Sequence, residues 1–186
     1  MANKFNQHLV EKGAQLILQG LGVDLKDHNY LLTPERYARA LREMFIADDT
    51  DWATFEEKYN DFVMLRGHQV YSLCPHHLLP VFMKVSIAYI PDGKVLGISK
   101  LARLIDDINN GPMLQERLTE LAPLRLSEIC SPNNGIACAV SGRHMCMSMR
   151  GVKSQGDLFT SKLTGDFETN TKLADRFFRL VGEQRV

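Results

Sequence analysis

Residues 82–90 have the sequence Phe82-Met-Lys-Val-Ser-Ile-Ala-Tyr-Ile90, and Pro91-Asp-Gly93 follows directly. Apolar side chains alternate with polar or small ones along this stretch, which is the pattern of a strand with one buried face. The Pro-Asp-Gly sequence is typical of a turn, and residues 94–98 are expected to return as the second arm of a hairpin. The buried face is predicted to carry Met83, Val85, Ile87 and Tyr89.

Helical patterns flank this hairpin on both sides. Thr33-Pro34-Glu35 offers a capping hydroxyl, a proline for the first turn and an acid, which together predict a helix start. A weaker helical segment is predicted over residues 54–63. After the hairpin, Ser99 is expected to cap one helix and Pro112 to open another. Pro123 falls inside the second of these helices and is expected to kink or interrupt it.

The order of these elements places the chain in the α+β class. Residues 133–135, Asn-Asn-Gly, predict a turn, and a strand is expected over about residues 136–150. Residues 171–181 have the apolar spacing of a closing helix. We therefore expect an N-terminal helical segment, residues 1–63, followed by a core of residues 64–186 that forms one structural unit.

The overall composition excludes several classes of protein. The 186 residues carry 22 basic and 22 acidic side chains, so no global field attracts nucleic acid or a membrane surface, and neither is expected as a partner. No apolar run approaches the roughly 20 residues that span a bilayer. The N-terminal residues also lack the apolar stretch of a signal peptide, so a cytoplasmic protein with reduced cysteines is expected.

Two short motifs, Cys74-Pro75-His76-His77 and His144-Met145-Cys146, concentrate thiol and imidazole groups. These groups are preferred zinc ligands, and a Cys-x-x-His pair at a strand end can supply two of them. A third ligand from the distant cysteine leaves the fourth position open, as in catalytic zinc sites. Three ligands and two further histidines predict a hydrolytic site. A closed structural zinc module is the alternative, although no fourth ligand lies close in the sequence. Cys130 and Cys138 are expected to be core thiols.

The second motif lies on the expected strand, where a period of two places alternate side chains on one face. That face would align a base (His144), a zinc ligand (Cys146), a hydroxyl (Ser148) and a cation (Arg150), with neighbours about 7 Å apart. An exposed polar face with a stray cysteine is the alternative. In the first motif both adjacent histidines can contribute only if the backbone bends, which Pro75 favours; otherwise His76 only packs or hydrogen-bonds. The residues of the strand face are His144, Cys146, Ser148 and Arg150.

Basic side chains three residues apart lie near the starts of two expected helices, where free backbone N–H groups also favour anions. A solvated helix face is the alternative for each pair. Gln115 and Glu116 lie near a third helix start. A buried carboxylate there could accept two N–H donors from a guanine edge, and decoration of the helix surface is the alternative. The basic pairs are Lys100 with Arg103 and Arg36 with Arg39, and Arg150 adds a cation from the strand.

Taken together and in order, these motifs resemble GTP cyclohydrolase I of the zinc-dependent type, over roughly residues 8–180. The resemblance implies the tunnelling fold, an antiparallel sheet backed by helices that assembles as a toroidal homodecamer of two pentamers with active sites between subunits. The motifs that carry it are Thr33-Pro-Glu-Arg-Tyr-Ala-Arg39, Tyr71-Ser-Leu-Cys-Pro-His-His-Leu-Leu-Pro80, Ala88-Tyr-Ile-Pro91, Gly97-Ile-Ser-Lys-Leu-Ala-Arg103, Gln115-Glu-Arg-Leu-Thr119 and His144-Met-Cys-Met-Ser-Met-Arg-Gly151.

The resemblance also implies a role for each site residue. Zn²⁺ would be bound by Cys74, His77 and Cys146. Proton transfer would fall to His76 and His144, with Ser99 nearby. The guanine ring would be held by Glu116 beside Gln115. The triphosphate would be held, in part from a neighbouring subunit, by Lys100, Arg103, Arg150, Arg36 and Arg39.

The reaction of this family opens the imidazole ring of GTP by hydrolysis, releases C8 as formate and closes the pterin ring of 7,8-dihydroneopterin triphosphate. Zinc lowers the pKa of bound water toward neutrality. Histidine suits the proton transfers because its ordinary pKa is about 6.5. The same first reaction serves folate, other pterins and deazaguanines, so the sequence does not select the pathway.

Two rival functions share parts of this pattern. The nitrile reductase of queuosine biosynthesis has the same fold but needs a nucleophilic cysteine in a different motif. A non-catalytic paralogue could bind GTP and zinc as an assembly or regulatory partner, and release of formate from GTP would distinguish the enzyme from it. The chain departs from the family at Pro75, where an acid is usual, and at Met83, where glycine is usual. Neither departure removes a ligand or a proton-transfer group.

Overall fold

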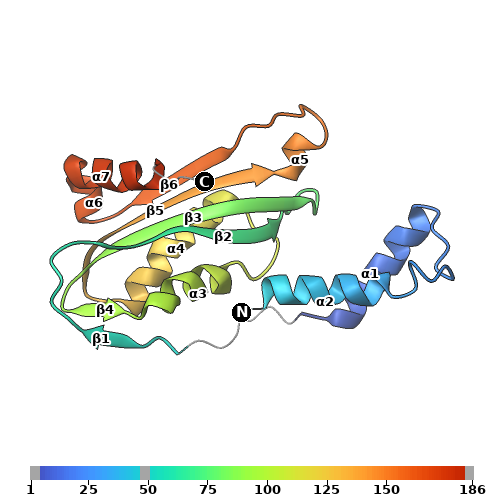
Figure 1. The fold of residues 1–186 in the computed structure, drawn as a ribbon, viewed down its shortest axis with the longest axis horizontal. Coiled ribbons are helices and arrows are strands. Elements are labelled where there is room, and N and C mark those ends of the chain that lie inside the picture. The colour runs from blue at the N-terminus through green and yellow to red at the C-terminus, as the bar shows by residue number, and fades with distance from the viewer. Residues whose placement is uncertain (1–4, 47–50, 183–186) are drawn as a thin grey trace. The chain divides into compact units, whose positions relative to one another are not determined.

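The computed structural model describes residues 5–46 and 51–182 (Figure 1). The chain divides into two compact units, Met1–Ala47 and Asp48–Val186. In neither described range is there a helix long and apolar enough to cross a membrane.

The first unit contains two helices, α1 (Gln7–Gly20) and α2 (Thr33–Phe45). The Asn6 side chain caps α1 by accepting a hydrogen bond from the backbone N–H of Leu9 at 3.0 Å. Helix α2 begins at Thr33 with Pro34 in its first turn, but Leu32 is the N-cap and no side chain caps the helix, so the predicted cap by the Thr33 hydroxyl is wrong. Several large apolar side chains of this unit remain mostly exposed, so the helix pair buries little apolar surface of its own. Among them are Leu9, Leu16, Ile17 and Leu21.

The second unit is built on a four-stranded antiparallel sheet in the order β2-β3-β5-β6. Its strands are β2 (Val63–Leu73), β3 (Pro80–Pro91), β5 (Asn133–His144) and β6 (Leu158–Leu163). The alternation predicted for residues 82–90 is confirmed, because every second side chain of β3 packs into the main core. These buried residues are Met83, Val85, Ile87 and Tyr89.

Helices cover both faces of the sheet (Figure 1). Helices α3 (Ile98–Ile108) and α4 (Gln115–Ile129) pack on one face and enclose the main core. Helices α6 (Asp166–Thr169) and α7 (Thr171–Gly182) lie on the other face, where Phe177 packs against Phe167. The predicted closing helix is therefore confirmed as α7, and the mixed architecture of helices on an antiparallel sheet agrees with the expected α+β class.

Two predictions about the start of this unit are wrong. The segment predicted as weakly helical contains a strand, β1 (Thr54–Glu56), and β4 (Lys94–Leu96) pairs with β1 instead of returning on β3. The turn itself is present, with Gly93 at a φ of 78°. Strand β3 already pairs with β2 on one edge and β5 on the other, so it has no free edge for a hairpin partner.

Helix α4 also differs from its prediction, because it runs from Gln115 to Ile129 as one helix with Pro123 inside. A proline in a helix removes one backbone hydrogen bond. Three fully buried side chains on either side of it, Leu118, Ala122 and Leu126, anchor the helix to the sheet. Tertiary packing on both flanks of the proline thus outweighs the local cost.

Candidate active site

The loop between β2 and β3 brings two of the predicted metal ligands side by side. The backbone N–H of Cys74 donates to the carbonyl of Leu79 at 2.8 Å, and that of Leu78 donates to the carbonyl of Cys74 at 2.8 Å. This tight turn places Cys74 Sγ 3.8 Å from His77 Nδ1. His76 Nδ1 lies 3.9 Å from the same sulfur, so both adjacent histidines face the cysteine. The bend expected between them is present.

The second motif departs from the predicted strand. Strand β5 ends at His144, opposite Val81, and the next residues form the short helix α5 (Met145–Ser148). Strand β3 begins at Pro80, so a longer β5 would find no partner for its backbone groups. The chain satisfies them locally instead, and Met149 N–H donates to the first carbonyl of α5 at 2.9 Å. Alternate side chains of residues 144–150 therefore do not share a strand face, contrary to our prediction.

The helical turn nevertheless delivers Cys146 to the loop. One ligand atom from each of Cys74, His77 and Cys146 lies within 4.8 Å of the other two. Bonds of about 2.0–2.3 Å to a tetrahedral ion put neighbouring N and S ligands roughly 3.5–3.8 Å apart, which fits the 3.8 Å measured between Cys74 Sγ and His77 Nδ1. Within residues 5–46 and 51–182 this group has three members, which leaves a tetrahedral ion one open position. Two thiols and an imidazole can thus hold a metal ion.

Burial and the adjacent Cys74 thiol raise the pKa of Cys146 above its ordinary value in the absence of a metal. A bound cation has the opposite effect, since it stabilises the thiolate that ligates it. The Cys146 thiol is therefore expected to ionise, and so to become a good ligand, together with binding of the metal ion.

His144 lies at the edge of this group and is half-buried. Its Nε2 is 3.0 Å from Oε1 of Gln115, the first residue of α4. Burial lowers the pKa of His144, and the negative charge of Glu116 opposes that effect. Glu116 is exposed, and its charge acts on the His144 imidazole. The Glu116 carboxylate, this imidazole and the three candidate metal ligands therefore lie at one end of the sheet.

Arg150 contacts the metal group directly. Its Nη1 lies 2.9 Å from His77 Nε2, on the side of the ring opposite Cys74. This contact requires an unprotonated Nε2, because a guanidinium has donors only. The guanidinium is thus held within reach of whatever binds beside the metal ligands.

The comparisons with known proteins agree with this geometry. The model of the family described as GTP cyclohydrolase I matches residues 10–182. The chain belongs to the GTP cyclohydrolase I family. It is 42% identical over 175 residues to GTP cyclohydrolase 1 of Aquifex aeolicus (strain VF5), covering 92% of this chain and 95% of the relative. It is 37% identical over 183 residues to GTP cyclohydrolase 1 of Sulfurihydrogenibium sp. (strain YO3AOP1), covering 97% of each.

Three other residues of the GTP cyclohydrolase I motifs, Ser99, Lys100 and Arg103, lie on α3. Ser99 and Lys100 stand in the first turn of α3, whereas the far end of α3 is the one near the metal. There the side-chain amide of Asn109 donates to the Tyr71 carbonyl at 2.8 Å, three residues before Cys74. The rise of a helix puts Ser99 about 15 Å from that end. Ser99 and Lys100 therefore lie at the end of α3 away from the metal ligands, and Arg103 lies about 9 Å along the helix from the nearer end. Arg36 and Arg39 belong to α2 of the first unit.

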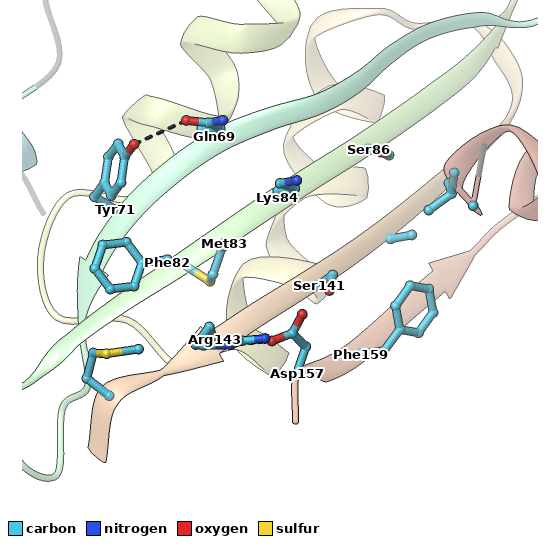
Figure 2. A pocket seen from close by; sticks show the side chains of 14 residues that line it. Gln69, Tyr71, Phe82, Met83, Lys84, Ser86, Ser141, Arg143, Asp157 and Phe159 are labelled. Carbon is cyan, nitrogen blue, oxygen red and sulfur yellow. Dashed lines mark hydrogen bonds and ion pairs between the residues drawn. The ribbon is translucent and has the colours of Figure 1, made fainter. Parts of the chain in front are cut away.

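A cavity of about 740 Å³ lies elsewhere in the second unit. Figure 2 shows it over the sheet face opposite α3 and α4, where Lys84 and Phe82 of β3 point into it. Arg143 is paired there with Asp157 at 2.7 Å. The lining contains no cysteine or histidine, so this cavity lacks the proposed metal ligands and proton-transfer groups.

Two residues of the site have no signal in the sequence. Gly142 leaves the space into which the Gln115 side chain reaches, and Thr160 of β6 binds the Gln115 amide at 3.1 Å. A single glycine or threonine in a strand carries no pattern by itself. Only the register of β5 with β6 reveals their contact with α4.

Proposed function

We propose that this protein hydrolyses GTP to formate and 7,8-dihydroneopterin triphosphate, the reaction of the GTP cyclohydrolase I family. The observation that carries the proposal is the convergence of Cys74, His77 and Cys146 with His144 and Glu116. Such a group combines an open metal position with a proton-transfer residue, which hydrolysis of an unreactive ring requires.

We propose zinc as the metal, because two thiolates and one imidazole are ligands that zinc prefers. Zinc bound there supplies Lewis acidity that makes water a nucleophile near neutral pH. If His77 held the metal through Nδ1, which faces Cys74, its ring proton would be on Nε2 and Arg150 could not donate to that nitrogen. Its guanidinium is then available to an anionic substrate, in agreement with the role proposed for Arg150 at the triphosphate.

His144 and His76 are the proposed proton-transfer residues. They come from the two segments that carry the ligands: His144 ends β5, two residues before Cys146, and His76 lies in the β2–β3 loop beside Cys74. A guanine ring whose C8 faces the open metal position can therefore receive a proton at N7 from a histidine. We propose that Glu116, one residue beyond Gln115, holds the opposite N–H edge of the base.

The remaining basic residues support a site shared between subunits. We propose that Lys100 and Arg103, with Ser99, act on the substrate bound at a neighbouring chain's metal ligands, because Ser99 and Lys100 begin α3 at the end opposite the one that contacts the segment before Cys74. The exposed apolar residues of α1 are consistent with an N-terminal segment, residues 1–63, that packs in an oligomer beside the core of residues 64–186. A homodecamer of two pentamers, with Arg36 and Arg39 at the triphosphate, is the proposed assembly, and the cytoplasm its proposed location.

Incubation of the zinc-loaded protein with GTP tests the proposal. We expect stoichiometric formate, measured with a coupled dehydrogenase, and a pterin that becomes fluorescent after oxidation. The Cys146→Ser variant is the matched control and is expected to release neither product. Binding of GTP to the zinc-loaded protein without formate would instead favour the non-catalytic paralogue, which the intact ligands and histidines do not favour.

A further inference from the structure

The Gln115 side chain is fully buried at the start of α4, although glutamine is usually exposed. Its amide nitrogen lies 3.0 Å from the carbonyl oxygen of Val140, 3.0 Å from that of Leu158 and 3.1 Å from Thr160 Oγ1. An amide NH₂ has two hydrogens, so three acceptors use its donor capacity completely. No N–H of this side chain is left over for a substrate base.

These acceptors also fix which way the amide faces. Rotating it by half a turn would aim its oxygen at two backbone carbonyls, which have no hydrogen to give. Nε2 must therefore face β5 and β6, and Oε1 must face His144 Nε2, which lies 3.0 Å away. Since Oε1 can only accept, the hydrogen of this bond belongs to His144 Nε2. Neutral His144 then has a free lone pair on Nδ1.

A second layer of hydroxyls supports the same arrangement. Thr119 Oγ1 donates to the backbone carbonyl of Gln115 at 2.8 Å and lies 2.6 Å from Thr160 Oγ1. With the Thr119 hydrogen used in this way, Thr160 must be the donor between the two hydroxyls. Its oxygen remains free to accept from the Gln115 amide. Both hydroxyl hydrogens of this buried network thus have a consistent place.

Gly142 supplies the space that this arrangement needs. It lies two residues before His144 on β5, and a Cβ atom there would collide with Gln115 Oε1 and approach Met83 Cγ to 3.2 Å. Its φ is outside the left-handed region, so a side chain would act through contact and without backbone strain. Position 142 therefore controls whether the Gln115 carbonyl can reach the imidazole.

We propose that Gln115 is a positioning residue that fixes the tautomer and ring orientation of His144, and that Gly142 provides the space for this contact. The proposal rests on the proposed function and refines it, because it gives Gln115 a role through His144 in place of contact between its amide and the guanine ring. The backbone carbonyls of β5 and β6 thereby determine which nitrogen of His144 faces the reaction.

The first test replaces the carbonyl acceptor. Gln115→Met keeps a long side chain without an acceptor, and Gly142→Ala displaces the native carbonyl. Both are expected to keep zinc and to lower kcat between about tenfold and a hundredfold, less than removal of the imidazole. KM for GTP should change less than twofold. Gly156→Ala is the control, because a Cβ there meets only Ser154 Oγ at 3.5 Å.

A spectroscopic measurement separates this proposal from the proposed function. Magic-angle-spinning NMR of sedimented protein labelled with ¹⁵N-histidine reports which ring nitrogen carries hydrogen, and a His144→Gln variant assigns the signal. We expect a protonated Nε2 for His144 in the wild type and loss of that preference in Gly142→Ala. This result stands even if the wild type releases no formate, and it does not require Gln115→Met to fold.

Three outcomes would overturn the proposal. A wild-type His144 signal with hydrogen on Nδ1 would contradict the tautomer. An unchanged kcat with a raised KM in Gln115→Met would indicate direct contact with substrate. Equal kcat values for Gly142→Ala and Gly156→Ala would show that position 142 does not control the contact.

Discussion

The four cysteines of this chain lie in two regions that treat a thiol differently. Cys138, in the middle of β5, is fully buried, and burial raises its pKa to about 12. Cys130, at the end of α4, is buried beside Tyr89, and burial raises its pKa as well. Cys74 and Cys146 instead lie where regular strands end, next to imidazoles. Reactive chemistry is therefore located where the backbone turns, and the interior of the sheet keeps its thiols protonated.

Removing one metal ligand should have the largest effect and would test this contrast directly. Cys74→Ser, His77→Ala and Cys146→Ser are each expected to lose stoichiometric zinc and all measurable turnover, because no nearby side chain can replace the lost bond. Zinc content by emission spectroscopy and formate release measure both effects. Cys130→Ala is expected to keep the metal. Loss of zinc in Cys130→Ala would abolish the distinction between the two regions.

Removing a proposed proton-transfer residue should have the next largest effect. His144→Ala and His76→Ala are expected to retain zinc and to lose on the order of a hundredfold or more in kcat, the contribution of a positioned acid or base. Parallel measurement of zinc and turnover separates this role from coordination. If either variant lost zinc together with activity, that histidine would join the ligands.

The sequence predicts some of these features because local pattern and tertiary structure agree. Alternation along residues 82–90 requires a strand with one buried face, and the Cys74-x-x-His77 spacing needs only a tight turn to bring its ends together. The three proposed ligands therefore follow from residue type and spacing. The three ligands still lie together although the segment after His144 is a helical turn, because this turn also places Cys146 beside the β2–β3 loop.

Other features depend on distant partners that no local pattern contains. Residues 144–150 show the same alternation as a true strand, yet β3 begins at Pro80, beside the partner of His144, and offers them no backbone hydrogen-bond partners. Strand β4 follows a good turn, yet both edges of β3 are taken. The buried amide of Gln115 is also decided by two strands that come later in the chain. Each difference arises from the availability of partners, which sheet order alone determines.

Neutralising Glu116 is expected to have a smaller effect than removing a histidine. Glu116→Gln would replace a charge-assisted pair with the base by a neutral one, and about tenfold to a hundredfold in kcat/KM for GTP should be lost. Glu120→Gln, one turn further along α4 and paired with Lys162 at 3.3 Å, is the matched control. Wild-type turnover of ATP at a rate close to that of GTP would contradict a guanine-selecting role for Glu116.

The smallest effect is expected when the folded protein is treated with an alkylating reagent, because the Cys138 thiol should hardly react. At pH 8 a thiol with a pKa of about 12 is ionised in about one molecule in 10,000, against about one in four for an ordinary thiol. Higher pH increases the thiolate, so labelling should rise with pH. Even at pH 9, however, Cys138 would be ionised in only about one molecule in 1,000.

Cys146 is half-exposed, so in metal-free protein treated with iodoacetamide at pH 8 it should be labelled at least about a hundredfold faster than Cys138. Peptide mapping by mass spectrometry measures the two rates in one sample, and labelling in denaturant shows that Cys138 can react once exposed. Both thiols are acids with raised pKa values, but only Cys138 is also closed to reagent by the helices on the sheet. Comparable rates in the folded state would mean that the interior of β5 opens to solvent, and the contrast between the two regions would then fail.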